Sequence, residues 1–157
     1  MWGLLLGLSV MAILVLAVGV WQGRLGERVR RDLDGAETLY REEDARAFLG
    51  HRAKLAAGSQ VMTGEVLVTE RAVVFFRRSA VLNRQPIVLV RDDRTAGFDA
   101  VGMLRLVLAG PPGRGRTPFE NAPAIVVRGV QRGVEFTLTI RSSDPERLLA
   151  ALERFAD

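Results

Sequence analysis

Residues 64–75 read GEVLVTERAVVF, and this stretch decides the fold. Up to Thr69, apolar residues are mixed with polar ones and include β-branched valines, as expected for a strand. Glu70 and Arg71 interrupt the pattern, and an apolar run resumes at Ala72. Two short strand patterns separated by a polar pair predict a β-hairpin.

Further strand patterns follow the hairpin toward the C-terminus. β-Branched and aromatic residues recur in short runs, separated mostly by charged or Gly/Pro-containing turns. The expected strands cover residues 61–69, 72–76, 87–90, 104–108, 125–127 and 134–140. Six or seven short strands at this spacing predict an antiparallel β-barrel or sandwich.

The end of the chain predicts a helix that covers this sheet. Asp144 is a suitable N-cap, Pro145 fits the first helical position, and Glu146 adds an acidic residue to the first turn. The apolar residues that follow recur at helical spacing: Leu148, Leu149, Leu152 and Phe155. We expect their face to cover an open end or edge of the sheet.

Residues 64–75 also carry a resemblance. They resemble the opening hairpin of bacterial PH-like and GRAM-like domains, which often reads Gly, alternating apolar residues, Thr, an acidic turn residue, Arg, then apolar residues to Phe. The whole chain resembles small actinobacterial single-pass membrane proteins of unknown function, which pair an N-terminal helix with such a domain. The resemblance implies a PH-like β domain over residues 61–157. No residues match a defined phosphoinositide-binding motif, so no lipid specificity is implied.

Residues 1–22 predict a transmembrane helix. They read MWGLLLGLSVMAILVLAVGVWQ and contain no charged side chain. A helix of about 20 residues rises about 30 Å, the thickness of the hydrocarbon core of a bilayer. Trp2 and Trp21 lie at its ends, where aromatic rings favour the interface. The alternative is a cleaved signal peptide that releases a secreted domain, but the basic N-terminal region of such peptides is missing.

Four arginines follow the apolar segment: Arg24, Arg28, Arg30 and Arg31. Only Glu27 opposes them, and no basic side chain precedes the segment. The positive-inside rule then predicts a cell-membrane protein with its N-terminus outside and its C-terminal domain in the cytoplasm. The same arginines are candidates for contact with anionic lipid headgroups or a partner.

Glycines in and just after the apolar segment have the spacing that lets two helices approach closely. The two pairs are Gly3 with Gly7 and Gly19 with Gly23. Glycine is common in membrane helices, so the sequence leaves a homo-oligomer open.

Residues 23–60 predict a helical linker. Apolar residues follow spacings of three and four from Leu25 to Tyr40. Charge changes sign along it, from +3 over residues 24–31 to −5 over residues 32–44. This order predicts a stalk that stands off an anionic membrane surface, with a helical ion pair between Glu42 and Arg46 on its side.

The sequence shows no catalytic constellation. The 157 residues include no cysteine, which excludes thiolate catalysis and thiolate metal sites. Serine-hydrolase elbows, phosphate-binding loops and zinc-protease motifs are also missing from the sequence. We therefore expect no enzyme activity, no cofactor and no metal. The alternative is an enzyme with a shallow carboxylate site made by Asp92, Asp93 or Asp99.

Arginine supplies 21 of the 22 basic residues, and the formal net charge is +4. Residues 110–118, GPPGRGRTP, predict an irregular loop whose Arg114 and Arg116 could contact headgroups or an acidic partner. Nucleic acid is not expected as a partner, because Phe119 is the one aromatic residue near this loop on which a base could stack.

Together these features predict a membrane-anchored α+β protein. The expected parts are a transmembrane helix at 1–22, a juxtamembrane helical linker at 23–60, and a PH-like β domain with a C-terminal capping helix at 61–157. The expected role is that of a scaffold or accessory subunit, whose cytoplasmic domain binds a protein partner or membrane lipid.

Overall fold

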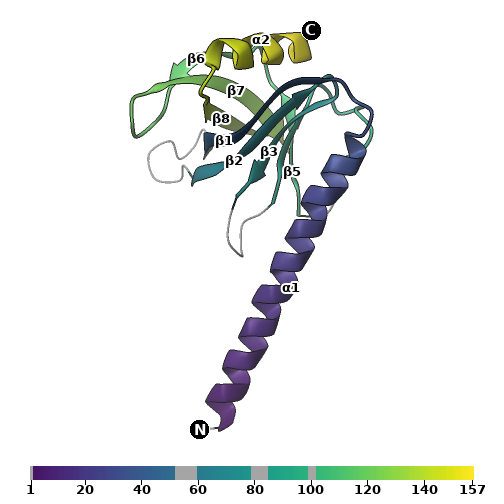
Figure 1. The fold of residues 1–157 in the computed structure, drawn as a ribbon, viewed down its shortest axis with the longest axis vertical. Helices are drawn as coiled ribbons and strands as arrows, with labels where there is room; N and C mark the ends of the chain where they lie inside the picture. Colours follow the sequence, from purple (N-terminus) through teal and green to yellow (C-terminus); the bar gives the residue numbers. More distant parts are fainter. Residues whose placement is uncertain (1, 52–59, 79–84, 99–101) are drawn as a thin grey trace.

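The computed structural model describes residues 2–51, 60–78, 85–98 and 102–157 (Figure 1). In this part of the chain it has two helices and eight strands. They are α1 (Trp2–Asp32), β1 (Thr38–His51), β2 (Gln60–Thr69), β3 (Ala72–Arg77), β4 (Ile87–Val90), β5 (Leu104–Leu108), β6 (Gly113–Arg116), β7 (Pro123–Gln131), β8 (Val134–Arg141) and α2 (Pro145–Ala156).

Seven of the strands close into a barrel. Their order is β5-β4-β3-β2-β1-β8-β7, and β7 returns to β5 through the pairs Val107–Val130 and Leu108–Gly129. The extra strand β6 pairs with β7 outside the closed ring. All neighbours are antiparallel except β4 and β5, which run parallel. The expectation of a purely antiparallel sheet is wrong at this pair, because β5 begins at the same end of the barrel as β4, with Leu104 opposite Ile87.

The predicted linker helix is wrong beyond residue 32. The chain turns at Gly35, whose φ of 81° glycine adopts without strain, and β1 then pairs with both β2 and β8. The β domain therefore begins at Thr38 rather than at residue 61. A register shift between Glu42 and Ala45 breaks the alternation of β1, which explains why its strand pattern was hidden. The rest of the predicted linker, residues 52–59, lies outside the described residues.

The predicted irregular loop at 110–118 is also partly wrong. Its centre forms β6, and Gly115 has a steric role there. A Cβ atom at Gly115 would lie 2.4 Å from Cγ2 of Val126, so only glycine lets β6 approach β7 this closely.

The inner core fills the barrel and is completed by α2 (Figure 1). The predicted cap is confirmed, since the backbone N–H of Arg147 donates to Asp144 at 3.1 Å and Pro145 opens the helix. The α2 residues buried against the barrel interior are Leu148, Ala151, Leu152 and Phe155, while Leu149 is partly buried. Three of the four predicted apolar contacts are thus fully buried, and one end of the barrel is closed by this helix.

A second apolar cluster lies on the outer wall of the barrel, under α1. Residues of β3 and β4 alternate between the two faces, and both faces are buried. The outer cluster contains Val29, Leu33, Ala72, Val74, Val88, Val90, Phe98 and Met103. The last turns of α1 are therefore part of the barrel wall, and the predicted free-standing stalk is wrong.

The direction of α1 relates it to the two ends of the barrel. Near its C-terminus, the carbonyl oxygen of Asp32 accepts a hydrogen bond from Arg71 at 2.6 Å, in the β2–β3 turn. About three turns earlier, the ring of Trp21 packs over Gly102, just before β5. Residues before Trp21 project past the barrel, at the end opposite α2 (Figure 1). We call this the anchor-side end, and the end that α2 covers the capped end.

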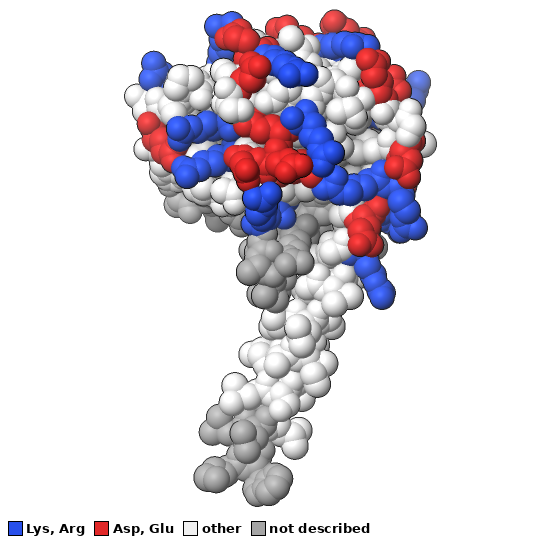
Figure 2. Space-filling view, in the orientation of Figure 1, with Lys and Arg blue, Asp and Glu red and all other residues white. Residues whose placement is uncertain are grey.

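The projecting half of α1 is apolar and exposed. By length and composition, α1 is the one helix in the described residues that could cross a membrane. Figure 2 shows a shaft without charged side chains below a barrel that carries charges of both signs. The large apolar side chains exposed on this shaft of α1 are Leu6, Leu8, Val10, Met11, Ile13, Leu14, Leu16, Val18, Val20 and Trp21.

Candidate functional site at the helix–barrel junction

Of the four predicted basic contact residues that belong to α1, three lie on one face of the helix. Arg24, Arg28 and Arg31 are exposed, and their spacing of four and three places them together. The buried residues Leu25 and Val29 face the barrel instead. These three guanidinium groups therefore point away from the barrel, just beyond the apolar shaft.

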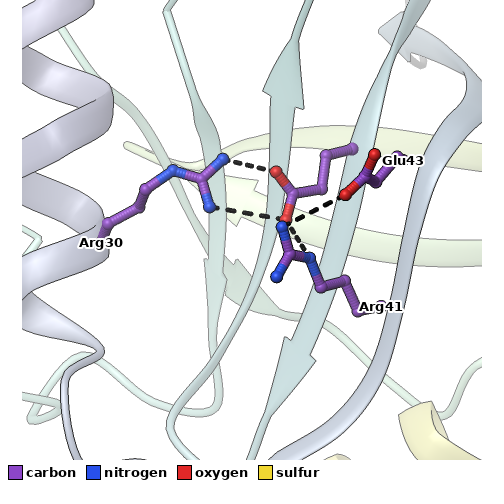
Figure 3. Close-up of polar contacts among 4 residues, drawn as sticks. Arg30, Arg41 and Glu43 are labelled. Carbon is purple, nitrogen blue, oxygen red and sulfur yellow. Dashed lines mark hydrogen bonds and ion pairs between the residues drawn. The ribbon is translucent and has the colours of Figure 1, made fainter.

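Arg30 belongs to a different group, a charged cluster around Glu65 that joins α1 to the barrel (Figure 3). The Glu65 carboxylate forms an ion pair with Arg30 and accepts from Nε of Arg41 at 2.8 Å. Arg41 also reaches Glu43 at 3.4 Å. The guanidinium of Arg30 lies 4.1 Å from the ring centroid of Phe76. Arg30 is thus engaged in packing rather than free for a headgroup.

Burial makes the Glu65 cluster more than a surface ion pair. The Glu65 side chain is only 11% exposed, whereas those of Arg41 and Glu43 are more than half exposed. Shielding from water strengthens the attraction between Glu65 and the two arginines. The cluster connects α1, β1 and β2, so it fixes the helix against the barrel.

Arg114 and Arg116 lie at the capped end, far from the shaft of α1. Arg114 pairs with Glu146 of α2 at 2.6 Å, and Arg116 donates to the carbonyl oxygen of Asn121 at 3.0 Å. Both belong to β6, which pairs with the first residues of β7. The structure therefore does not bring them together with Arg24, and one flat membrane cannot meet both groups.

The predicted helix-packing glycines lie in α1. A Cβ atom at Gly7 or Gly23 would meet no other atom within 4 Å, so both surfaces are open. Gly19 is half-buried, and the surroundings of Gly3 lie outside the described residues. The geometry leaves space for a second helix without showing one.

The carboxylates of the alternative enzyme hypothesis do not converge. Asp92 accepts from the backbone N–H of Arg94 at 2.8 Å, which is a turn-forming contact. Asp93 instead pairs with Arg105 at 3.1 Å. Asp99 lies outside the described residues. Within the described ranges, no group of three or more acidic or histidine side chains could hold a metal ion.

Sequence reasoning missed a groove of about 750 Å³ on the barrel wall, which extends from Asp93, after β4, to Gly102 near the anchor-side end. It opens where β5 separates from β7, because only two residue pairs join these strands. Its apolar walls come from Phe98, Met103, Val107, Leu108 and Val130, and Gly102 lies at its margin under the Trp21 ring. Segments distant in sequence form it, so no local pattern could have indicated it.

Two arginines line the groove, and they differ in whether a carboxylate pairs with them. Arg105 donates to the carboxylate of Asp93 at 3.1 Å and to the carbonyl oxygens of Asp93 and Thr95 at 3.2 and 3.3 Å. Arg132 lies exposed in the β7–β8 turn with a φ of 50°. Among the residues that the structure describes, no carboxylate pairs with Arg132, so its charge stays available.

Phe119, which the sequence analysis considered only for base stacking, is an exposed aromatic residue. It is 60% exposed, and its ring lies 6.2 Å from that of the buried Phe48. The neighbouring Glu120 pairs with Arg46 at 2.8 Å and also with Arg141. Arg46 therefore pairs with Glu120 on the outer surface of the barrel, and the predicted helical pair with Glu42 is wrong because β1 is a strand. Two ion pairs thus fix the turn that presents Phe119.

Glu42 takes part in a polar cluster at the capped end. It accepts from the Tyr40 hydroxyl at 2.7 Å and from the backbone N–H of Ser143 at 2.9 Å. Burial acts to raise the pKa of Glu42, but these donors and Ser142 lower it below its ordinary value. Burial, together with the nearby Glu42 charge, raises the pKa of Tyr40 to about 12. The cluster ties β1 to the turn before α2, which is a structural role.

Comparison of the chain with models of protein families and with curated proteins finds no match. Its function is therefore inferred from the geometry of these sites.

Proposed function

We propose that this chain is a single-pass membrane protein that holds a PH-like barrel at the cytoplasmic face of the cell membrane. The barrel acts as an interaction module, in the manner of a scaffold or accessory subunit, and binds a protein partner or membrane lipid. One observation carries the proposal: a single unbroken helix contains both an exposed apolar shaft and a segment built into the barrel wall.

The junction supports a fixed orientation of the barrel. Val29 is fully buried and Leu33 is 6% exposed, and both lie on the outer wall of β3 and β4. Glu65 adds charged contacts from the same helix to β1 and β2. A barrel attached in this way cannot turn freely about its anchor, so its anchor-side end faces the bilayer.

The barrel layout supports the PH-like part of the proposal. A closed ring of seven strands followed by a helix over one end agrees with the PH-like layout, from which the parallel β4–β5 pair departs. The capped end is occupied by α2, which leaves the opposite end and the outer wall for ligands.

Charge supports the cytoplasmic orientation. Arg24, Arg28 and Arg31 lie on the exposed face of α1 directly after the apolar shaft. Positive residues in this position are retained on the cytoplasmic side during insertion.

Phe119 supports the binding of a protein partner. Exposed aromatic side chains on ordered turns are common centres of binding energy in protein interfaces. Outside α1, Phe119 and Val61 are the large apolar side chains most exposed among the described residues. Glu120 fixes the turn through Arg46 and Arg141, so little ordering is required on binding.

Topology can be tested with single introduced cysteines, because the chain has none. Ser143→Cys lies exposed at the capped end. In intact cells we expect no labelling by a membrane-impermeant maleimide, and full labelling after the membrane is permeabilised. Labelling in intact cells contradicts the cytoplasmic orientation. Recovery of the domain in the soluble fraction without its first residues establishes signal cleavage instead.

Partner binding can be tested with a photoreactive phenylalanine analogue at Phe119. We expect a discrete crosslinked protein from membranes, and its loss in Glu120→Lys, which removes both ion pairs of the turn. The same analogue at Arg147, an exposed position on α2, is the matched control. Equal crosslinking from both positions, or none from Phe119, contradicts this surface.

A further inference from the structure

The groove between β5 and the β7–β8 turn lies where a bilayer surface is expected. Trp21 marks the end of the apolar shaft, a position that aromatic rings favour at the membrane interface. A Cβ atom at Gly102 would lie 2.1 Å from the Trp21 ring, so the ring and this margin of the groove are in contact. If the proposed anchoring holds, the groove opens at the level of the lipid headgroups.

The groove has the chemical character of a site for an amphiphile. Met103, Val107 and Val130 supply apolar walls. The volume of about 750 Å³ lies within the range of small-molecule sites, which is roughly 300–1,000 Å³. The apolar part of the groove is stabilised when a hydrocarbon chain covers it.

The charges of the groove select the sign of the headgroup. Arg105 pairs with the Asp93 carboxylate and donates to the carbonyl oxygens of Asp93 and Thr95. Arg132 is exposed at the groove margin, and none of the described carboxylates pairs with it. Among the described residues of the margin, Arg132 is therefore the cation without a paired carboxylate, which favours an anion.

We propose that this groove holds one anionic lipid drawn from the adjoining leaflet. Its acyl chain lies along Met103, Val107 and Val130, and its headgroup meets Arg132. The inference rests on the proposed membrane anchoring. A lipid is favoured over a peptide because the Trp21 contact places the groove against the bilayer, where lipid is present at high local concentration.

The test uses the full chain in phosphatidylcholine nanodiscs that contain a minor fraction of phosphatidylglycerol with a photoreactive acyl chain. We expect crosslinks to residues 102–108 and 128–134, in addition to those on the shaft of α1. The same probe on phosphatidylcholine should label the α1 shaft equally but the groove less.

Two variants test the contacts of the acyl chain and of the lipid headgroup separately. Val130→Trp fills the groove and should remove most groove crosslinks. Arg132→Gln removes one cation, which should lower the preference for phosphatidylglycerol by about fivefold, since one arginine near a membrane contributes ~1 kcal/mol. Arg147→Gln, which removes a cation from the capped end, should change neither result.

Crosslinking of the α1 shaft and crosslinking of the groove together show whether the lipid site or the membrane anchoring has failed. Labelled α1 with an unlabelled groove overturns the lipid site and leaves the anchor intact. Unlabelled α1 overturns the anchoring on which both proposals rest. Groove labelling that is unchanged in both Val130→Trp and Arg132→Gln also overturns the site. If Val130→Trp fails to fold, Arg132→Gln alone provides this test, because Arg132 lies on an exposed turn.

Discussion

The two helices pack on the same barrel in different ways. α2 is short, is capped by Asp144 and completes the inner core with Leu152 and Phe155. α1 is 31 residues long, and only its last turns are buried, on the outer wall. A helix can therefore become part of a barrel either by closing its interior or by covering strands that are apolar on both faces.

The strands under α1 explain its position. In β4, all four residues are buried, because Ile87 and Leu89 face the interior while Val88 and Val90 face α1. A strand that is apolar on both faces requires a second covering layer. The comparison of the two helices can be tested by changing one contact at a time.

The largest effect is expected from Phe155→Ala in α2. Phe155 is 1% exposed in the inner core, so the cavity left behind should lower the free energy of unfolding by about 3–5 kcal/mol. Chemical denaturation of the full chain in detergent micelles measures this change. Arg154→Ala, which removes an exposed pair with Glu37, should cost less than about 1 kcal/mol. Similar losses in both variants contradict the role of α2 as the closure of the core.

The second largest effect is expected from Val29→Ala in α1. Deleting its two methyl groups should lower the free energy of unfolding by about 2 kcal/mol. Val29 is fully buried on the outer wall, whereas Val20 is 56% exposed on the shaft. Val20→Ala should therefore leave the unfolding of the barrel unchanged in the same assay. If Val29→Ala also has no effect, α1 is a loose tether and the two helices differ more than the structure indicates.

Glu65→Gln should cost about 1–2 kcal/mol, because two arginines lose their charged partner in a shielded position. Glu43→Gln is the matched control, since its side chain is 66% exposed and its pair is expected to contribute little. Hydrogen exchange of residues 25–32 should rise in Glu65→Gln alone. Equal behaviour of the two variants would show that the cluster does not fix α1.

Glu42→Gln, at the turn before α2, should cost about 1 kcal/mol at neutral pH through weakened hydrogen bonds. The pKa of Glu42 is lowered in the folded state, so its charge stabilises the fold above the ordinary value of 4.5. That stabilisation is lost as the pH falls through the folded pKa. The difference between wild type and variant should therefore disappear in acid, and a constant difference over this range refutes the linkage.

The smallest effect concerns Tyr40, the one tyrosine of the chain. Its phenolate absorption should appear at about pH 12 instead of near 10, because burial disfavours the charged form. A raised pKa stabilises the fold below pH 10 and this contribution is lost as the pH approaches 12. Titration near pH 10 would show that the turn before α2 is open to water.

The sequence predicted features whose cause is local. The Asp144 cap, the apolar face of α2, and strands β4 and β5 were placed correctly, because capping and short β-branched runs depend on near neighbours. The strand β1 was misread as a helix because its bulge between Glu42 and Ala45 disrupts the period of two. Arg30 could not be separated from Arg24 without knowing that Glu65 lies beside it.

The sequence alone determined that the chain begins with an apolar helix long enough to cross a membrane and ends with a helix that covers a strand-rich domain. These features follow from hydrophobic period and capping, which are properties of adjacent residues. Three features became visible only in the folded chain: α1 continues into the barrel wall, Arg114 lies at the opposite end from Arg24, and a groove opens beside Trp21. Each of these depends on which distant strands pair, since pairing sets the free faces and seams of the barrel.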